Sequence, residues 1–176
     1  TERFDTAQMI YIPSVETTAL DGDTVSHVGT VKKEAVITDI VNYTNLIPGK
    51  SYRVQGTLMV RETGEALLMG GQPVRAEQSF IPEAPSGSVI LSYTVDSTLL
   101  SGKTVVVFED LLFEGITLVS HADLEDESQS VHYPEIGTEA TAGGSHAVTA
   151  GEVKEIRDPV KLTNLIPGET YTLRGK

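Results

Sequence analysis

Apolar and polar residues alternate with a period of two over much of the chain. Five runs are rich in β-branched residues, and several of them show this alternation: residues 35–46 (AVITDIVNYTNL), 51–60 (SYRVQGTLMV), 87–95 (GSVILSYTV), 103–113 (KTVVVFEDLLF) and 116–124 (ITLVSHADL). Turn-forming sequences such as IPGK, ETGE, GGQP, APSG and LLSGK separate them. Alternation bounded by turns is typical of β-strands with one buried face. Residues 65–70 (EALLMG) are predicted instead to form a helical turn, which the glycines at 70 and 71 end.

These runs favour one fold class. Seven or so short strands at a spacing of roughly 8–12 residues, without a helical period, predict an all-β protein. More narrowly, they predict an immunoglobulin-like antiparallel β-sandwich. Residues 14–19 (SVETTA) and 129–133 (QSVHY) would be its first and last strands. In such sandwiches these two strands commonly run side by side.

One sequence block occurs twice. DIVNYTNLIPGKSYRVQG (39–56) returns as DPVKLTNLIPGETYTLRG (158–175), with TNLIPG shared in full. Ahead of it, PSVETTA, which starts at Pro13, returns as PEIGTEA, which starts at Pro134. Repetition of several blocks in the same order indicates a tandem array of similar domains.

The repeat also divides the chain. DTAQMIYIP (5–13) matches DESQSVHYP (126–134), so the chain contains the end of one repeat as well as the start of another. We expect residues 1–12 to be the last strand of a preceding repeat. Residues 13–133 should form a complete domain, and residues 134–176 the opening third of a following repeat.

Composition narrows the range of partners. The formal net charge is −12, and a surface of that sign repels the phosphate backbone of nucleic acids. The chain contains no cysteine, so disulfides and thiolate metal sites do not stabilise it. No run approaches the roughly 20 apolar residues of a membrane-spanning helix. We therefore expect no nucleic-acid partner, no cofactor and no membrane span in this fragment.

The stretch HADLEDESQ (121–129) gathers a histidine, several carboxylates and a glutamine. Oxygen ligands suit calcium, but the spacing is not that of an EF-hand loop, and zinc would need more histidines or cysteines than His121 alone. A hydrolase would use His121 as the base for an activated hydroxyl, yet no G-x-S-x-G motif occurs. Taken alone, the stretch is typical of a solvated acidic turn, and we expect no metal site.

Together with VVFE (106–109), however, this stretch resembles a known family. The pattern is similar to VaFE-type repeat domains of Gram-positive cell-surface adhesins, and more narrowly to their immunoglobulin-like domains with a Thr–Gln ester cross-link. The resemblance covers residues 13–133 and includes ETTALDG, NYTNLIPGKSYRVQGTLM, TGE and SGSVILSYTVD. It implies that Thr17 on the first strand attacks the side-chain amide of Gln129 on the last strand and releases ammonia.

The resemblance also implies three assisting residues: Glu109, which ends VVFE, and His121 and Asp126, which lie eight and three residues before Gln129. Burial and mutual charge can tune Glu109 and His121 to take the hydroxyl proton together. His121 can then protonate the leaving ammonia. We expect Asp126 to stay protonated and to donate a hydrogen bond to the amide oxygen. Such a reaction runs once per molecule, so the protein is not an enzyme in the ordinary sense.

Neighbouring repeats should carry equivalent residues. Gln8 aligns with Gln129 and would belong to the preceding repeat, whereas Thr138 aligns with Thr17 and would be the nucleophile of the following one. Linkage of Gln8 or Thr138 to another segment or chain stays open. The remaining histidines, at positions 27, 132 and 146, have no partner at a ligand spacing and are expected at the surface.

Two alternatives to the ester remain. A lysine–asparagine isopeptide bond would need a lysine on the first strand and an asparagine on the last. No lysine precedes Lys32, and the closing segment contains no asparagine. In the other alternative the fold carries no cross-link, Thr17 is an ordinary strand residue and Gln129 is a surface amide.

The expected function follows from the covalent bond. Tying the first strand to the last would stabilise an extracellular domain without cysteine. We expect a stalk segment of an adhesin on the cell wall of a Gram-positive bacterium, with adjacent repeats of the same polypeptide as its partners and a host-surface ligand bound elsewhere in the protein. The alternative is that this domain itself binds a host glycan or protein.

Overall fold

The computed structural model describes residues 9–151 and 155–175. Within them the regular structure consists of antiparallel strand pairs and two short 3-10 helices, η2 (Ser97–Leu100) and η3 (Glu127–Gln129). The predicted all-β antiparallel fold is therefore confirmed. No helix in this part of the chain has the length and hydropathy needed to span a bilayer.

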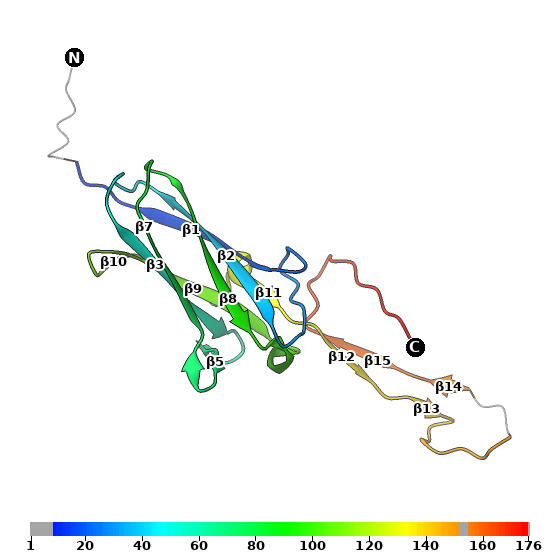
Figure 1. The fold of residues 1–176 in the computed structure, drawn as a ribbon. Coiled ribbons are helices and arrows are strands. Elements are labelled where there is room, and N and C mark those ends of the chain that lie inside the picture. The colour runs from blue at the N-terminus through cyan, green and yellow to red at the C-terminus, as the bar shows by residue number, and fades with distance from the viewer. Residues whose placement is uncertain (1–8, 152–154, 176) are drawn as a thin grey trace.

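Two sheets face each other in the main body of the molecule (Figure 1). The first sheet has the strand order β1 (Ser14–Asp21), β2 (Ala35–Thr44), β8 (Gly87–Val95). The second has the order β10 (Ile116–His121), β9 (Thr104–Phe113), β3 (Tyr52–Val60), β4 (Glu65–Ala66), with β7 (Arg75–Phe80) also paired to β3 and β11 (Ser130–His132) also paired to β9. The arrangement is the predicted sandwich.

The core fills the space between these sheets, because alternate residues of each strand point inward. On β2, the side chains of Ile37 and Val41 are buried while their sequence neighbours are partly or fully exposed. β3 and β8 follow the same alternation. The period of two in the sequence thus reports directly which face of each strand is buried.

Two strands share one edge of β9. β10 pairs with residues 109–113 of β9, and β11 pairs with residues 104–106. The chain crosses from β10 to β11 through a loop that ends in η3. The last strand therefore belongs to the second sheet, whereas the first strand, β1, forms an edge of the first sheet. The two strands lie close together without pairing, at the open side of the sandwich.

One local prediction was wrong, and one strand was missed. The segment EALLMG is not a helical turn: Glu65–Ala66 forms β4, and β5 (Leu68–Met69) pairs with β6 (Gln72–Pro73) in a tight hairpin. Its two turn residues are glycines with φ of 60° and 80°, the conformation that such two-residue hairpins require. β7 was not predicted, because its sequence RAEQSF is mostly polar and the strand lies largely exposed along β3.

The strand pairing at the start of residues 13–133 recurs after Pro134. β12 (Glu135–Thr138) pairs with β15 (Val160–Thr163), and β13 (Thr141–Ala142) pairs with β14 (Ile156–Arg157). Thr138 lies opposite Val160, as Thr17 lies opposite Val41 in the complete domain. These strands extend away from the sandwich, at the end opposite to that at which the chain enters (Figure 1).

Candidate cross-linking site

Thr17 lies near the middle of β1, where alternation directs its side chain into the sandwich. Only 4% of the residue is exposed, and Ala19 and Asp21, two and four positions later, are also buried. Thr18 is half-buried on the other face of the strand. Of the adjacent threonines, Thr17 is therefore the one whose hydroxyl reaches the interior.

Gln129 reaches the same interior from the opposite sheet. It ends η3, whose N-cap is Asp126. The Asp126 carboxylate accepts hydrogen bonds from the Ser128 backbone N–H (2.8 Å) and the Ser128 hydroxyl (2.6 Å). This capping turns the chain so that the Gln129 side chain points inward, where it is completely buried. Ser130 then continues into β11.

The two side chains meet. Gln129 Nε2 donates to Thr17 Oγ1 and also to Glu109 Oε2. Gln129 Oε1 has no hydrogen-bond partner, although it is buried. The structure thus brings together the hydroxyl, the amide and the carboxyl that the sequence singled out, with Thr17 and Gln129 lying 112 positions apart in the chain.

Asp39 is a fourth member of this cluster and was not predicted. It lies on β2 directly opposite Ala19 of β1, and it is completely buried. Burial raises the pKa of Asp39 to about 6, and burial together with the neighbouring Asp39 raises the pKa of Glu109 to about 10. Both Asp39 carboxylate oxygens and Glu109 Oε1 are buried without a hydrogen-bond partner among the described residues. At neutral pH the pair therefore holds one proton and one negative charge.

His121 lies beside Glu109, because the two residues are directly opposite each other on β10 and β9 and so share a face of the sheet. Its Nε2 lies 3.1 Å from Asp126 Oδ2. Its Nδ1 is buried and has no hydrogen-bond partner. Asp126 thus fixes the ring from the solvent side and leaves Nδ1 free on the inner side.

The role predicted for Asp126 was wrong. Its hydrogen bonds from the Ser128 side chain and backbone, with His121 nearby, lower the pKa of Asp126 below its ordinary value. The carboxyl is therefore ionised at neutral pH and cannot donate a hydrogen bond to the amide oxygen. Asp126 acts instead on two neighbours: it caps η3 and it orients His121.

Tyr93 and Gly56 complete the surroundings of the carboxyl pair. Burial, with the nearby Asp39 and Glu109 charges, raises the pKa of the Tyr93 hydroxyl, which is buried without a hydrogen-bond partner. A Cβ atom on Gly56 would lie 1.8 Å from that hydroxyl oxygen, and Gly56 faces Glu109 across β3 and β9. The glycine therefore makes room for the phenol beside the site.

Arg61, which sequence reasoning also missed, holds the segment that carries Gln129. Its Nε donates to the Leu124 carbonyl (2.7 Å), its Nη1 to Glu127 Oε1 (2.7 Å) and its Nη2 to Ser130 Oγ (2.6 Å). A guanidinium with several donors in a fixed fork is suited to fixing such a loop. Arg61 lies just after β3 and carries no sequence signal beyond its charge.

The remaining predicted residues lie elsewhere. Thr138 is exposed on β12, and Gln8 falls outside the described residues. The described residues include no group of three or more histidine, aspartate and glutamate side chains arranged to hold a metal ion. His132 was expected at the surface without a partner, but it is half-buried and its Nε2 lies 2.8 Å from Glu127 Oε2.

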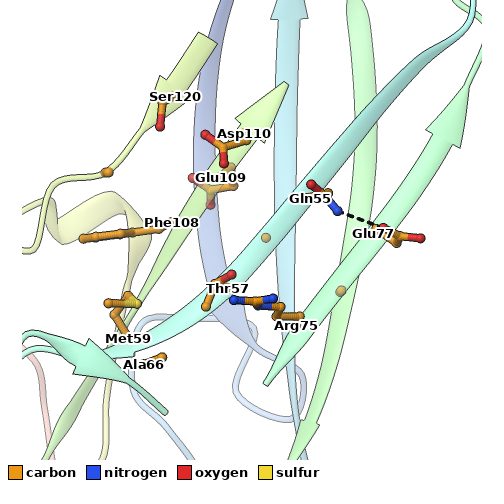
Figure 2. Close-up of a pocket in the computed structure, with 13 residues that line it drawn as sticks. Gln55, Thr57, Met59, Ala66, Arg75, Glu77, Phe108, Glu109, Asp110 and Ser120 are labelled. Carbon is orange, nitrogen blue, oxygen red and sulfur yellow. Dashed lines mark hydrogen bonds between the residues drawn. The ribbon is translucent and has the colours of Figure 1, made fainter. Parts of the chain in front are cut away.

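A groove of about 710 Å³ covers the outer face of the second sheet, over β3, β7 and β9 (Figure 2). Gln55 donates to Glu77 across it (3.0 Å), and Arg75 and Asp110 also line it. Glu109 also lines the groove although it is only 3% exposed, so the floor of the groove adjoins the residue that contacts Gln129 (Figure 2).

Comparison with known proteins gives three findings. The chain matches the model of the T-Q ester bond containing domain over residues 13–133 and again over residues 134–176. The comparison with curated proteins gives no match. Two similar solved structures are of a bacterial adhesin from Mobiluncus mulieris containing intramolecular disulfide, isopeptide and ester bond cross-links, in two crystal forms.

The likeness to the adhesin is one of fold. One structure is 19% identical, with a TM-score of 0.54, and the alignment covers 68% of this chain and 56% of the adhesin chain. The other is 16% identical, with a TM-score of 0.57, and the alignment covers 85% of this chain and 76% of the adhesin chain. The family model, matched twice in succession, confirms the tandem arrangement, and the chain belongs to the family of T-Q ester bond containing domains.

Proposed function

We propose that residues 13–133 form a self-cross-linking stalk domain, in which Thr17 and Gln129 join through an ester. The observation that supports this most directly is the buried contact between the Thr17 hydroxyl and the Gln129 amide. Two weakly reactive groups held in contact react as if at very high concentration. The Thr17 O–H and Gln129 C–N bonds break, an ester C–O bond forms, and the hydroxyl proton balances the ammonia that leaves.

In this proposal His121 accepts a proton and Glu109 donates one. His121 Nδ1, which is buried without a hydrogen-bond partner in the described part of the chain, takes the proton of Thr17. Glu109, which contacts the leaving nitrogen and is protonated at neutral pH, supplies the proton that completes ammonia. The proton on His121 then restores the carboxyl pair of Glu109 and Asp39. No proton is consumed overall.

Burial supports the lifetime of the product. An ester persists only where water is excluded, and Thr17, Gln129 and Glu109 are each at most 4% exposed. Val107 and Leu91, among the apolar core residues of β9 and β8, are buried as well. The same dry surroundings that raise the pKa of Glu109 would therefore protect the bond after it has formed.

The stalk role follows from where the chain enters and leaves. The chain enters at the start of β1 and leaves after β11, at opposite ends of the sandwich (Figure 1). A bond between Thr17 and Gln129 would carry tension from β1 to β11 directly, so that the intervening residues would not be pulled. This suits a repeated segment of an adhesin on the surface of a Gram-positive bacterium, with adjacent repeats as its partners and the host ligand bound elsewhere in the protein.

The intact mass of the folded, purified chain tests the ester. We expect the sequence mass less one ammonia, and the full sequence mass in Thr17→Ala. Thr18→Ala is the matched control, because Thr18 lies next to Thr17 but on the other face of β1, and it should lose ammonia normally. Alkaline hydroxylamine should then cleave the link, which separates an ester from an isopeptide. A folded chain that keeps its full mass would contradict the proposal.

A further inference from the structure

The side chain of Asn164 spans the boundary between the complete domain and the following repeat. Asn164 is the asparagine of the second TNLIPG block, just after β15. We propose that Asn164 is a latch that fixes the orientation of one repeat relative to the next. The partner surface is the exit end of the preceding domain.

Each polar atom of the Asn164 side chain is used at this boundary. Nδ2 donates to the Lys103 carbonyl (2.7 Å) and to the Tyr133 carbonyl (3.2 Å). Oδ1 accepts from the Thr104 hydroxyl (3.2 Å) and lies 3.4 Å from His132 Nδ1. A primary amide offers two donors and one acceptor oxygen, so this set of partners saturates it. All four partners precede Pro134, where the following repeat begins.

The backbone at Asn164 is suited to this position. Its φ is 58°, in the left-handed region that asparagine tolerates better than most residues. Asn45, the equivalent residue of the complete domain, has a φ of 59°, and its Nδ2 donates to the Ile12 carbonyl (2.8 Å). Ile12 and Tyr133 each precede the proline that opens a repeat. The asparagine therefore holds the incoming chain in both repeats.

The loop after η2, in residues 13–133, binds the chain segment that leads into β12. The Gly102 N–H donates to the Tyr133 carbonyl (2.9 Å), and the Tyr133 N–H donates to the Lys103 carbonyl (3.0 Å). Gly102 has a φ of 77°, and a Cβ there would lie 2.8 Å from a carboxylate oxygen of Glu135. The loop thus has room for the first residues of β12, and Asn164 closes over the same carbonyls.

The boundary is also connected to the segment that carries Gln129. His132, which contacts Asn164, lies against Glu127 of η3, and Glu127 pairs with Arg61. These contacts give the latch a rigid base, because Arg61 is itself anchored on the backbone at Leu124. The latch requires only folded repeats and does not depend on whether the ester forms.

Distances between spin labels test the latch in the full chain. The protein has no cysteine, so cysteines introduced at the exposed Lys50 and Lys161 can be labelled alone. We expect a narrow distance distribution with Asn164 present and a broad one in Asn164→Asp. Aspartate keeps the size and the tolerance of positive φ but loses both donors. An unchanged distribution in this variant would overturn the proposal.

A second variant separates loss of the latch from local unfolding of the following repeat, which would also broaden the distance distribution. Thr104→Val removes the hydroxyl that donates to Asn164 Oδ1 and leaves residues 134–176 untouched. It should broaden the distribution in the same direction, and hydrogen exchange at the Gly102 amide should rise about five- to tenfold in Asn164→Asp, the effect of about one lost hydrogen bond. No change in either measurement would refute the latch. The intact mass of the same samples reports the ester separately.

Discussion

Thr17 of the first sheet and Gln129, which directly precedes β11 of the second sheet, are in hydrogen-bond contact although they lie 112 positions apart in the chain. A covalent bond between them would close a large loop of the chain and would also join the two layers of the sandwich. The contact depends on β1 and β11 lying at the same open side of the fold.

Preventing the bond should lower stability substantially. Closing a loop of this length restricts the unfolded chain, and for a disulfide the corresponding stabilisation is about 2–5 kcal/mol. We expect Thr17→Ala to lose a free energy of unfolding of this order in urea, with an unchanged fold by circular dichroism. Thr17→Ser keeps the hydroxyl and should recover both the mass loss and most of the stability. Equal stability of Thr17→Ala and Thr17→Ser would rule this out.

Removing either carboxyl of the buried pair should slow the reaction. Glu109→Gln loses the proton donor at the leaving nitrogen, and Asp39→Asn loses the group that shares its proton. We expect bond formation to slow by about 10²–10⁴-fold in each, the usual size of an acid–base contribution. Mass spectra taken at intervals after refolding give the rate. Asp110→Asn, next to Glu109 on β9 but on the groove side, is the control and should react at the normal rate.

The uncross-linked form should lose stability as pH rises. The folded-state pKa of Asp39 is about 6, against an ordinary 3.8, so the folded protein holds a proton that the unfolded chain has released between these values. By linkage, the free energy of unfolding of Thr17→Ala should fall most steeply as pH rises to about 6, where both folded carboxyls hold protons that the unfolded chain has released. It should go on falling up to about 10 through Glu109 alone. Urea midpoints over a pH series measure this. The steeper fall below about pH 6 should be absent from the double variant with Asp39→Asn.

His121 and Asp126 should differ in the size of their effects. His121→Ala removes the proposed base and should nearly stop bond formation. Asp126→Asn keeps a group that can accept a hydrogen bond from His121 and should slow the reaction by about tenfold or less. Asp123→Asn is the matched control within the same acidic stretch. The Asp123 side chain lies exposed and, among the described residues, accepts a hydrogen bond only from the Glu125 N–H. A larger effect at Asp126 than at His121 would contradict these roles.

Gly56→Ala should disturb the site from the opposite strand. Its Cβ would overlap the Tyr93 hydroxyl and lie 2.9 Å from Leu91 Cδ1, so the phenol must move against the carboxyl pair. Overpacking of this kind costs about 1–3 kcal/mol. We expect a lower melting temperature and slower loss of ammonia. Gly56→Ala combined with Tyr93→Phe should recover part of both, because the clashing oxygen is gone.

The alternation of residues predicted the long strands and the sandwich, because burial on one face is written in the sequence with a period of two. It failed where that signal is weak. RAEQSF has only Ala76 and Phe80 as apolar residues on its inner face, and the short strands around Gly70 and Gly71 are too brief to alternate. In these segments the strand forms because it pairs with its neighbour. The residue pattern of a single strand does not predict that pairing.

The family resemblance predicted four site residues: Thr17, Gln129, Glu109 and His121. Their roles stay proposals. Asp39 could have been found from the residues themselves, because it lies in phase with the buried Ile37 and Val41 of β2. A charged residue on the buried face of a strand needs a partner. The ionised state of Asp126 could not have been predicted from the sequence, since it depends on hydrogen bonds from Ser128 that only the folded turn provides.

That β1 and β11 lie in separate sheets has a consequence for the order of folding and bond formation. The reacting groups come from opposite layers, so they meet only after both layers have formed and docked. The ester would then be a permanent record that a repeat reached its native packing. A repeat that misfolded would stay open to proteolysis and could be cleared, while its correctly folded neighbours were already sealed.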